Sequence, residues 1–233
     1  MKKPTREEFA KMQDHSVLEP NATEDQIRSR CEETLRYGFG ATYVNPCYVT
    51  FAKSILGDKA KVGTVVGFPH GANTTKVKII EGLQAIDDGA DKLDLVINIS
   101  KLRSGDLAYV TNELSEFLGA MKKHRDDIIV KVIIETCYLS HDEKVAACEI
   151  VAESGADFIK TSTGTGTAGS RIGDIRLMKR IVGDRVKIKA ADQIKTIEDA
   201  LAVIEEGATA IGESSGINTL ADFDKELWTK PDG

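Results

Sequence analysis

The chain alternates between two hydrophobic patterns. Short apolar runs rich in Val and Ile are separated by amphipathic stretches of about 12 to 20 residues. Such short runs between helices are typical of the buried strands of a parallel sheet. We place eight strands at 15–18 (HSVL), 41–45 (ATYVN), 62–66 (VGTVV), 93–97 (LDLVI), 129–134 (IVKVII), 157–160 (DFIK), 186–189 (VKIK) and 208–211 (ATAI). Eight such units predict an α/β protein with a single (β/α)8 TIM barrel.

Local signals at the ends of the expected helices agree with this count. A Gly-Ala pair precedes four of the strands, at 40–41, 89–90, 155–156 and 207–208, and glycine favours the left-handed turn that ends many helices. Thr23 and Ser140 are followed by the acidic or amide residues expected at helix starts. The segment before residue 13 predicts an extra N-terminal helix. Since no Pro-rich linker or low-complexity tract interrupts the pattern, we expect one domain over residues 1–233.

Composition narrows the class of partner. Hydrophobic residues make up 41% of the chain, and the net charge is −6 with acidic and basic residues mixed throughout. This mixture disfavours nucleic acid and membrane surfaces, which attract clustered Lys and Arg. No apolar run approaches the roughly 20 residues of a membrane span or forms a signal core. We therefore expect a cytoplasmic protein with a small-molecule partner, and free thiols at Cys31, Cys47, Cys137 and Cys148.

Three lysines carry the strongest chemical signal. Lys131, Lys160 and Lys189 lie 29 residues apart on successive predicted strands, each among apolar residues. We expect all three at a comparable height inside the barrel. Burial and a neighbouring ammonium both lower the pKa of a lysine, which makes its amine a nucleophile toward carbonyls. The alternative is that one or two of them lie at strand ends and reach solvent.

Asp94 is a charged residue within the apolar run of the fourth strand. Because an isolated buried carboxylate is costly, we expect it to face the barrel interior and pair with a lysine. A purely structural ion pair is the alternative interpretation.

The sequence resembles the deoxyribose-phosphate aldolases over nearly its whole length. The matching stretches are 14–20 (DHSVLEP), 65–69 (VVGFP), 89–98 (GADKLDLVIN), 131–136 (KVIIET) and 158–164 (FIKTSTG). The resemblance implies a class I aldolase in which Lys160 forms a Schiff base with the substrate. It also implies that Lys189 and Asp94 transfer protons and that Lys131 is their electrostatic neighbour.

No cofactor or metal is expected for this chemistry, because the iminium itself accepts the electrons of the broken bond. The four histidines form no metal-ligand motif. The expected substrate is therefore a small aldehyde or sugar that binds without a cofactor.

The sequence departs from that family where the substrate phosphate is expected. Two glycines of the family are replaced by Asp192 and Gln193, and Glu213 enters the segment after the eighth strand. We therefore predict a substrate without the 5-phosphate, bound through a polyol or amine tail. Substitutions at Tyr43, His70 and Thr165 are expected to make the pocket more polar. The full predicted substrate site consists of Ser16, Lys131, Gly164, Asp192, Gln193, Glu213, Ser214 and Ser215.

Three alternatives stay open at this point. Asp192 and Glu213 can point away from the site, or Arg171 or Lys195 can restore positive charge, and the protein is then an ordinary 2-deoxy-D-ribose 5-phosphate aldolase. A barrel without catalysis that only binds a small carbonyl or polyol is the third. A homodimer is expected from the resemblance alone.

Overall fold

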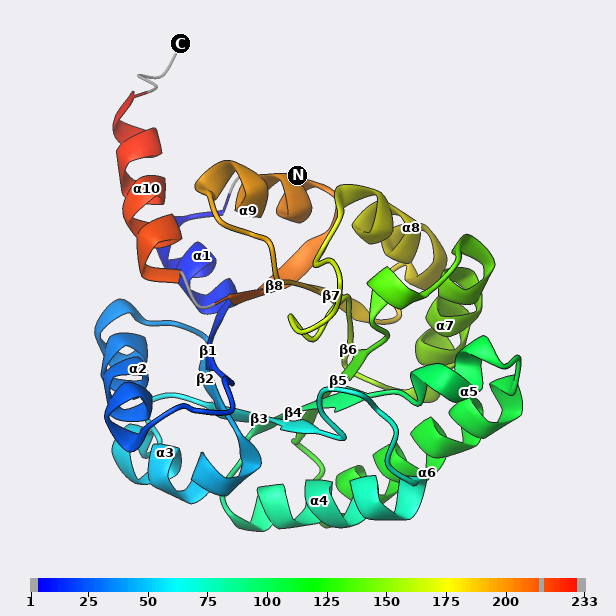
Figure 1. Cartoon of the computed structure of the whole chain (residues 1–233). Coiled ribbons are helices and arrows are strands. Elements are labelled where there is room, and N and C mark those ends of the chain that lie inside the picture. The colour runs from blue at the N-terminus through cyan, green and yellow to red at the C-terminus, as the bar shows by residue number, and fades with distance from the viewer. Residues whose placement is uncertain (1–3, 214–215, 230–233) are drawn as a thin grey trace.

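The computed structural model describes residues 4–213 and 216–229, which form a closed barrel of parallel strands surrounded by helices (Figure 1). The eight strands follow one another around the barrel in chain order. They are β1 (Gln13–Val17), β2 (Ala41–Val44), β3 (Val62–Val66), β4 (Lys92–Val96), β5 (Ile129–Ile133), β6 (Phe158–Lys160), β7 (Lys187–Ala191) and β8 (Ala208–Glu213). The predicted (β/α)8 barrel is confirmed.

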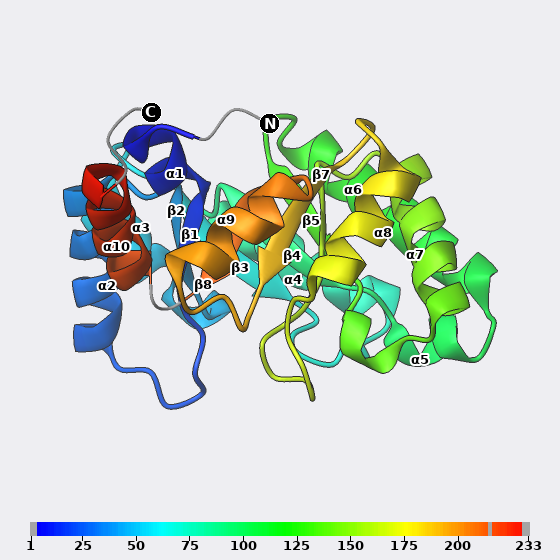
Figure 2. The same cartoon turned by 90° about the horizontal axis from the view of Figure 1, so that it is seen from above.

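The helices cover the outer face of the sheet. They are α1 (Arg6–Met12), α2 (Glu24–Tyr37), α3 (Val49–Leu56), α4 (Thr75–Asp87), α5 (Ile99–Arg103), α6 (Leu107–His124), α7 (His141–Ser154), α8 (Ile172–Val182), α9 (Ile197–Glu205) and α10 (Gly216–Thr229), with 3-10 turns η1 (Pro46–Tyr48) and η2 (Thr136–Tyr138). The predicted N-terminal helix is α1. Figure 2 shows the loops that follow β1 and β6 projecting from the edge opposite α1.

Helix caps fix where several of these elements begin. Thr23 and Ser140 both form complete capping boxes, with Gln26 and Glu143 as the reciprocal partners. Gly155 ends α7 in the left-handed conformation, as predicted. Gly40 is required for a different reason than a left-handed turn. A Cβ at this position would lie 2.2 Å from the backbone oxygen of Lys11, so only glycine leaves enough space.

The apolar core lies between the sheet and the helices, whereas the interior of the barrel is charged. Outward residues such as Leu93, Leu95, Val130 and Val132 are fully buried under the helices. The inward positions of the same strands include Asp94 and Lys131. All four cysteines are free thiols, as expected. In the described residues no helix is long and apolar enough to cross a membrane.

Candidate active site

The three predicted lysines enter the barrel interior, but not all at the same height. Lys160 and Lys189 are partners in the register of β6 and β7. Lys131 pairs instead with Phe158, two residues before Lys160. The expected equal height is therefore wrong for Lys131, because the strands of a closed barrel are staggered and equal sequence spacing does not give equal register.

Asp94 is the partner of two of these lysines. Its Oδ2 atom lies 2.7 Å from the Nζ of Lys160 and 3.0 Å from the Nζ of Lys189. All three side chains are at least 95% buried. The predicted pairing of Asp94 with a lysine is confirmed, and the alternative in which these lysines reach solvent at strand ends is wrong for Lys160 and Lys189.

A second carboxylate, Asp14 of β1, completes the charged cluster. Its Oδ2 atom forms an ion pair with Lys131 and lies 2.8 Å from the Nζ of Lys189, while Oδ1 accepts a hydrogen bond from Lys92 at 3.0 Å. Asp14 stands in the motif at 14–20, and its role was not predicted from the sequence. Asp14 and Ser16 alternate on one face of β1, but this alternation does not indicate which lysines Asp14 contacts.

The protonation states of the cluster follow from burial and neighbouring charge. Burial lowers the pKa of Lys131 to about 7. Burial likewise lowers the pKa of Lys160, and the positive charge of Lys189 adds to the shift. Burial opposes the charge on Lys189 as well, but the carboxylates of Asp14 and Asp94 outweigh it and raise its pKa. Lys160 is thus the better nucleophile, and Lys189 is the lysine that stays protonated and can donate a proton.

Burial alone would raise the pKa values of the two carboxylates. The surrounding lysines outweigh burial and hold the pKa of Asp14 and of Asp94 below the usual range. Both groups are therefore carboxylates at neutral pH and can accept protons or hydrogen bonds. The other oxygen of Asp94, Oδ1, has no hydrogen-bond partner among the described residues.

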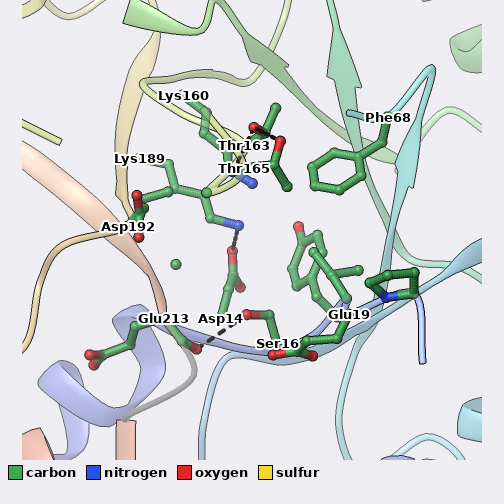
Figure 3. A pocket seen from close by; sticks show the side chains of 16 residues that line it. Asp14, Ser16, Glu19, Phe68, Lys160, Thr163, Thr165, Lys189, Asp192 and Glu213 are labelled. Carbon is green, nitrogen blue, oxygen red and sulfur yellow. Dashed lines mark hydrogen bonds and ion pairs between the residues drawn. The ribbon is translucent and has the colours of Figure 1, made fainter. Parts of the chain in front are cut away.

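A cavity of about 270 Å³ opens above this cluster at the carboxyl ends of the strands (Figure 3). This volume is close to the lower limit of small-molecule sites, roughly 300 Å³. The amines of Lys160 and Lys189 form its floor, and its walls come from the loops after β1, β3, β6 and β7 and from the end of β8. The lining residues are Asp14, Ser16, Leu18, Glu19, Pro20, Tyr43, Phe68, Lys160, Thr163, Gly164, Thr165, Lys189, Ala191, Asp192, Gly212 and Glu213.

The predicted substrate residues divide into those inside and those outside this lining. Ser16, Gly164, Asp192 and Glu213 line the cavity. Lys131 lies beneath it against Asp14, and Gln193 is exposed outside it. Of the three expected polar substitutions, Tyr43 and Thr165 line the cavity and His70 is exposed outside it. Ser214 and Ser215 lie outside the described residues.

The two acidic substitutions lie differently. The Glu213 carboxylate accepts a hydrogen bond of 2.7 Å from the hydroxyl of Thr219, and Figure 3 shows it pointing away from the lysines. Asp192 has a left-handed backbone with φ of 67°, and its side chain packs against Gly169 and Gly164. Gln193 follows with φ of 60°. A left-handed backbone favours glycine. The turn at residues 192–193 therefore has a conformation typical of glycine, although Asp192 and Gln193 occupy it.

Glu135 shapes the loop that carries Gly164, a role that was not predicted from the sequence. Its buried carboxylate accepts hydrogen bonds from the backbone N–H of Thr163, at 3.1 Å, and from the Thr163 hydroxyl. Glu135 itself has φ of 51°, which is rare for a residue with a side chain. No hydrophobic pattern marks such a residue, so only its place two residues after the end of β5 could have suggested it.

The sequence of this chain matches the family model described as DeoC/LacD family aldolase over residues 9–222. The chain belongs to the DeoC/LacD aldolase family. A curated relative is the deoxyribose-phosphate aldolase of Caldanaerobacter subterraneus subsp. tengcongensis, 49% identical over 219 residues, which are 94% of each chain. The chain is thus an aldehyde-lyase of the Schiff-base-forming class, and the alternative of a barrel without catalysis loses its support.

Solved structures of other aldolases agree. The aldolase QR15 is 39% identical, with a TM-score of 0.88 over 95% of this chain and 99% of that one. A deoxyribose phosphate aldolase from Aeropyrum pernix, whose structure is described as tetrameric, is 28% identical, with a TM-score of 0.86 over 95% of this chain and 93% of that one. The fold of the family therefore extends over nearly the whole of this aldolase.

Proposed function

We propose that this aldolase cleaves 2-deoxy-D-ribose 5-phosphate to acetaldehyde and glyceraldehyde 3-phosphate through a Schiff base on Lys160. The observation that carries the proposal is the position of the Lys160 amine at the cavity floor, 2.7 Å from Asp94 and beside the ammonium of Lys189. The relatives named deoxyribose-phosphate aldolase support this substrate over an unphosphorylated one.

The reaction begins with attack of the neutral Lys160 amine on the aldehyde carbon of the open-chain sugar. A C–N bond forms, the carbonyl oxygen takes a proton from Lys189, and the nitrogen gives up a proton to the Asp94 carboxylate, which yields a neutral carbinolamine. Asp94 returns that proton to the new hydroxyl, which leaves as water and produces the iminium. Lys189 is then a neutral amine and Asp94 again a carboxylate.

Cleavage follows when a base removes the proton of the hydroxyl on the third carbon. The bond between the second and third carbons breaks, and its electrons move into the iminium to form an enamine. The third carbon leaves as the carbonyl of glyceraldehyde 3-phosphate. The enamine then takes a proton on carbon, and water releases acetaldehyde and restores the Lys160 amine.

Reductive trapping tests the nucleophile. Borohydride added with acetaldehyde should reduce the iminium and leave an ethyl group on Lys160, detected by peptide mass spectrometry. Lys160→Ala is the blank, and Lys123→Ala, an exposed lysine on α6, is the matched control. Label on another lysine with Lys160 unmodified would disprove the assignment.

A substrate without the phosphate is the second candidate. The observation that favours it is the position of the Asp192 side chain in the lining of the cavity. At about 8 Å and an effective dielectric of about 40, one carboxylate repels each phosphate charge by roughly 1 kcal/mol. Glu213 supports this candidate less, because its carboxylate hydrogen-bonds Thr219 away from the lysines.

Rates of acetaldehyde release from 2-deoxyribose 5-phosphate and from 2-deoxyribose separate the two candidates. We expect the phosphorylated sugar to be preferred at least tenfold. Asp192→Gly should lower KM for the phosphorylated sugar several-fold, because it removes a negative charge and suits the left-handed backbone. The KM for 2-deoxyribose should not fall in parallel. Equal rates on both sugars in the wild type would favour the unphosphorylated substrate.

Three broader expectations belong to the same proposal. We propose that residues 1–233 act as one domain, that the protein works in the cytoplasm and that it uses no cofactor. A homodimer stays a prediction, which light scattering of the purified protein can test.

A further inference from the structure

Tyr43 of β2 lies inside the barrel next to the charged cluster. The sheet register sets it opposite Ser16 of β1 and Gly63 of β3, and only 1% of it is exposed. Gly63 provides the space for its ring, because a Cβ at residue 63 would lie 2.4 Å from two ring carbons. The ring can occupy this position because Gly63 on the neighbouring strand has no side chain.

The ring of Tyr43 lies under the ammonium groups of two lysines. Its centroid is 4.0 Å from the Nζ of Lys189 and 5.0 Å from the Nζ of Lys131. A cation over an aromatic face is attracted by the ring quadrupole, most strongly where water is excluded. No such contact with Lys160 occurs among the described residues. The ring therefore favours the charged form of Lys189 over that of Lys160.

The hydroxyl of Tyr43 adds no charge to the cluster. Burial raises its pKa, and the carboxylates of Asp14 and Asp94 raise it further, so the phenol stays neutral. The hydroxyl lies near the Asp94 carboxylate but forms no hydrogen bond of regular geometry among the described residues. Removing the ring therefore changes the environment of the lysines without changing the number of charges.

We propose that the ring of Tyr43 is a positioning residue that divides the protons between the two reactive lysines. By stabilising the ammonium of Lys189, it keeps the proton there and leaves Lys160 as the neutral amine. The ammonium of Lys189 disfavours a second positive charge on its neighbour, so a group that holds Lys189 charged also keeps Lys160 reactive. The inference rests on the proposed role of Lys160 as the Schiff-base lysine.

Every charged or titratable group around Lys189 enters this balance. They come from five strands and are Asp14 of β1, Tyr43 of β2, Asp94 of β4, Lys131 of β5 and Lys160 of β6. β8 contributes Gly212, where a Cβ would lie 2.8 Å from Lys189, and β3 contributes Gly63 beside the ring. Tyr43 is the member of this set that is neither a carboxylate nor an amine. Its ring can therefore be removed without changing the net charge of the cluster.

The test is the pH profile of kcat/KM in two matched variants. Tyr43→Phe keeps the ring, and Tyr43→Met replaces it with a flexible apolar chain that fills irregular space. The acidic limb of the wild-type profile reports loss of the proton that blocks Lys160, and the alkaline limb reports loss of the proton on Lys189. Both are apparent values of a coupled set.

We expect Tyr43→Phe to keep both limbs, whatever its rate. In Tyr43→Met the alkaline limb should move to lower pH by roughly one pH unit, while the acidic limb should stay in place, because Lys189 is still charged at that pH. The profile would then narrow from its alkaline side. An alkaline limb that does not move in Tyr43→Met, or that moves equally in Tyr43→Phe, would overturn the inference.

A second ring-free variant separates electrostatics from packing. The double variant Tyr43→Leu with Gly63→Ala refills part of the space on the other strand, so its packing differs from that of Tyr43→Met. Both should narrow the profile, and a wild-type profile in the double variant would attribute the effect to packing and overturn the inference. The double variant also decides the question if Tyr43→Met does not fold.

Borohydride trapping with acetaldehyde on the wild type keeps the two proposals apart. Absence of label on Lys160 would contradict the proposed function itself. Normal labelling of Lys160 together with an unchanged profile in both ring-free variants would contradict only the role of Tyr43.

Discussion

At the scale of single residues, the barrel interior holds more positive than negative groups. Lys131, Lys160 and Lys189 face two carboxylates, Asp14 and Asp94, and all five are at least 95% buried. Buried charges are costly unless they are paired. With too few carboxylates for its lysines, the cluster lowers the pKa of Lys131 and Lys160, mainly through burial. The nucleophile of the proposed mechanism is thus chiefly a consequence of burial, to which the excess of lysines adds.

The same imbalance predicts how stability varies with pH. The folded pKa of Lys131 is about 7, below its unfolded value of about 10.4. Between these values the unfolded chain binds more protons, so the free energy of unfolding rises with pH, by up to about 1.4 kcal/mol per pH unit for one lysine. In Lys131→Met this part of the rise should disappear in urea unfolding at pH 7, 8 and 9.

Lys160 adds a rise of the same sign, since its pKa is also lowered, so the variant should keep a weaker slope. Lys123→Met, which removes an exposed lysine from α6, is the control and should keep the wild-type slope. Equal slopes in Lys131→Met and the wild type would contradict the lowered pKa.

At the scale of elements, the sequence predicted where the strands lie better than where they end. β1 begins at Gln13, two residues before the predicted start, and β8 continues to Glu213, two residues beyond the predicted end. The added residues include Asp14, Gly212 and Glu213, which are polar or small and face the site. Hydrophobic periodicity marks strands by apolar side chains, so it cannot detect strand ends whose inward positions serve chemistry.

The connection between β5 and the loop after β6 makes an element-scale prediction. Glu135 holds this loop through two hydrogen bonds to Thr163, next to Gly164 and Thr165 of the cavity. Glu135→Gln keeps the size but loses the charge, and its amide has one oxygen as acceptor. We expect KM to rise several-fold, kcat to change less and amide hydrogen exchange to accelerate over residues 161–166.

Glu149→Gln on α7, at an exposed position, is the matched control for that measurement. Exchange over residues 161–166 that is as slow in Glu135→Gln as in the control would show that other contacts hold the loop.

At the scale of the whole molecule, the sequence predicted the architecture and the central chemistry but not the complete site. Asp94 was expected to pair with a lysine, and it contacts both Lys160 and Lys189. Asp14 was missed because its ion pair with Lys131 joins residues 117 positions apart, and no local pattern carries that information. Gln193 was expected in the site because of its sequence position, but its side chain is exposed outside the cavity.

The two ends of the barrel are expected to serve different purposes. The cavity lies at the carboxyl ends of the strands, whereas α1 covers the opposite edge (Figure 2) and packs against α10. There the fully buried rings of Phe9 and Phe223 stack with centroids 4.8 Å apart. In TIM barrels the carboxyl end carries catalysis and the amino end stability, so a defect at Phe9 should affect folding and spare the reaction.

Phe9→Ala tests this separation. Loss of a buried phenylalanine costs about 3 to 5 kcal/mol, so the urea midpoint of the variant should fall clearly below that of the wild type. Phe9→Leu leaves a smaller cavity and should lose less. For the fraction that stays folded at 25 °C, kcat/KM should remain within about twofold of the wild type, since Phe9 does not line the cavity. A large fall in kcat/KM at full folding would mean that packing at the amino end controls the lysine cluster, and the two ends would then form one functional unit.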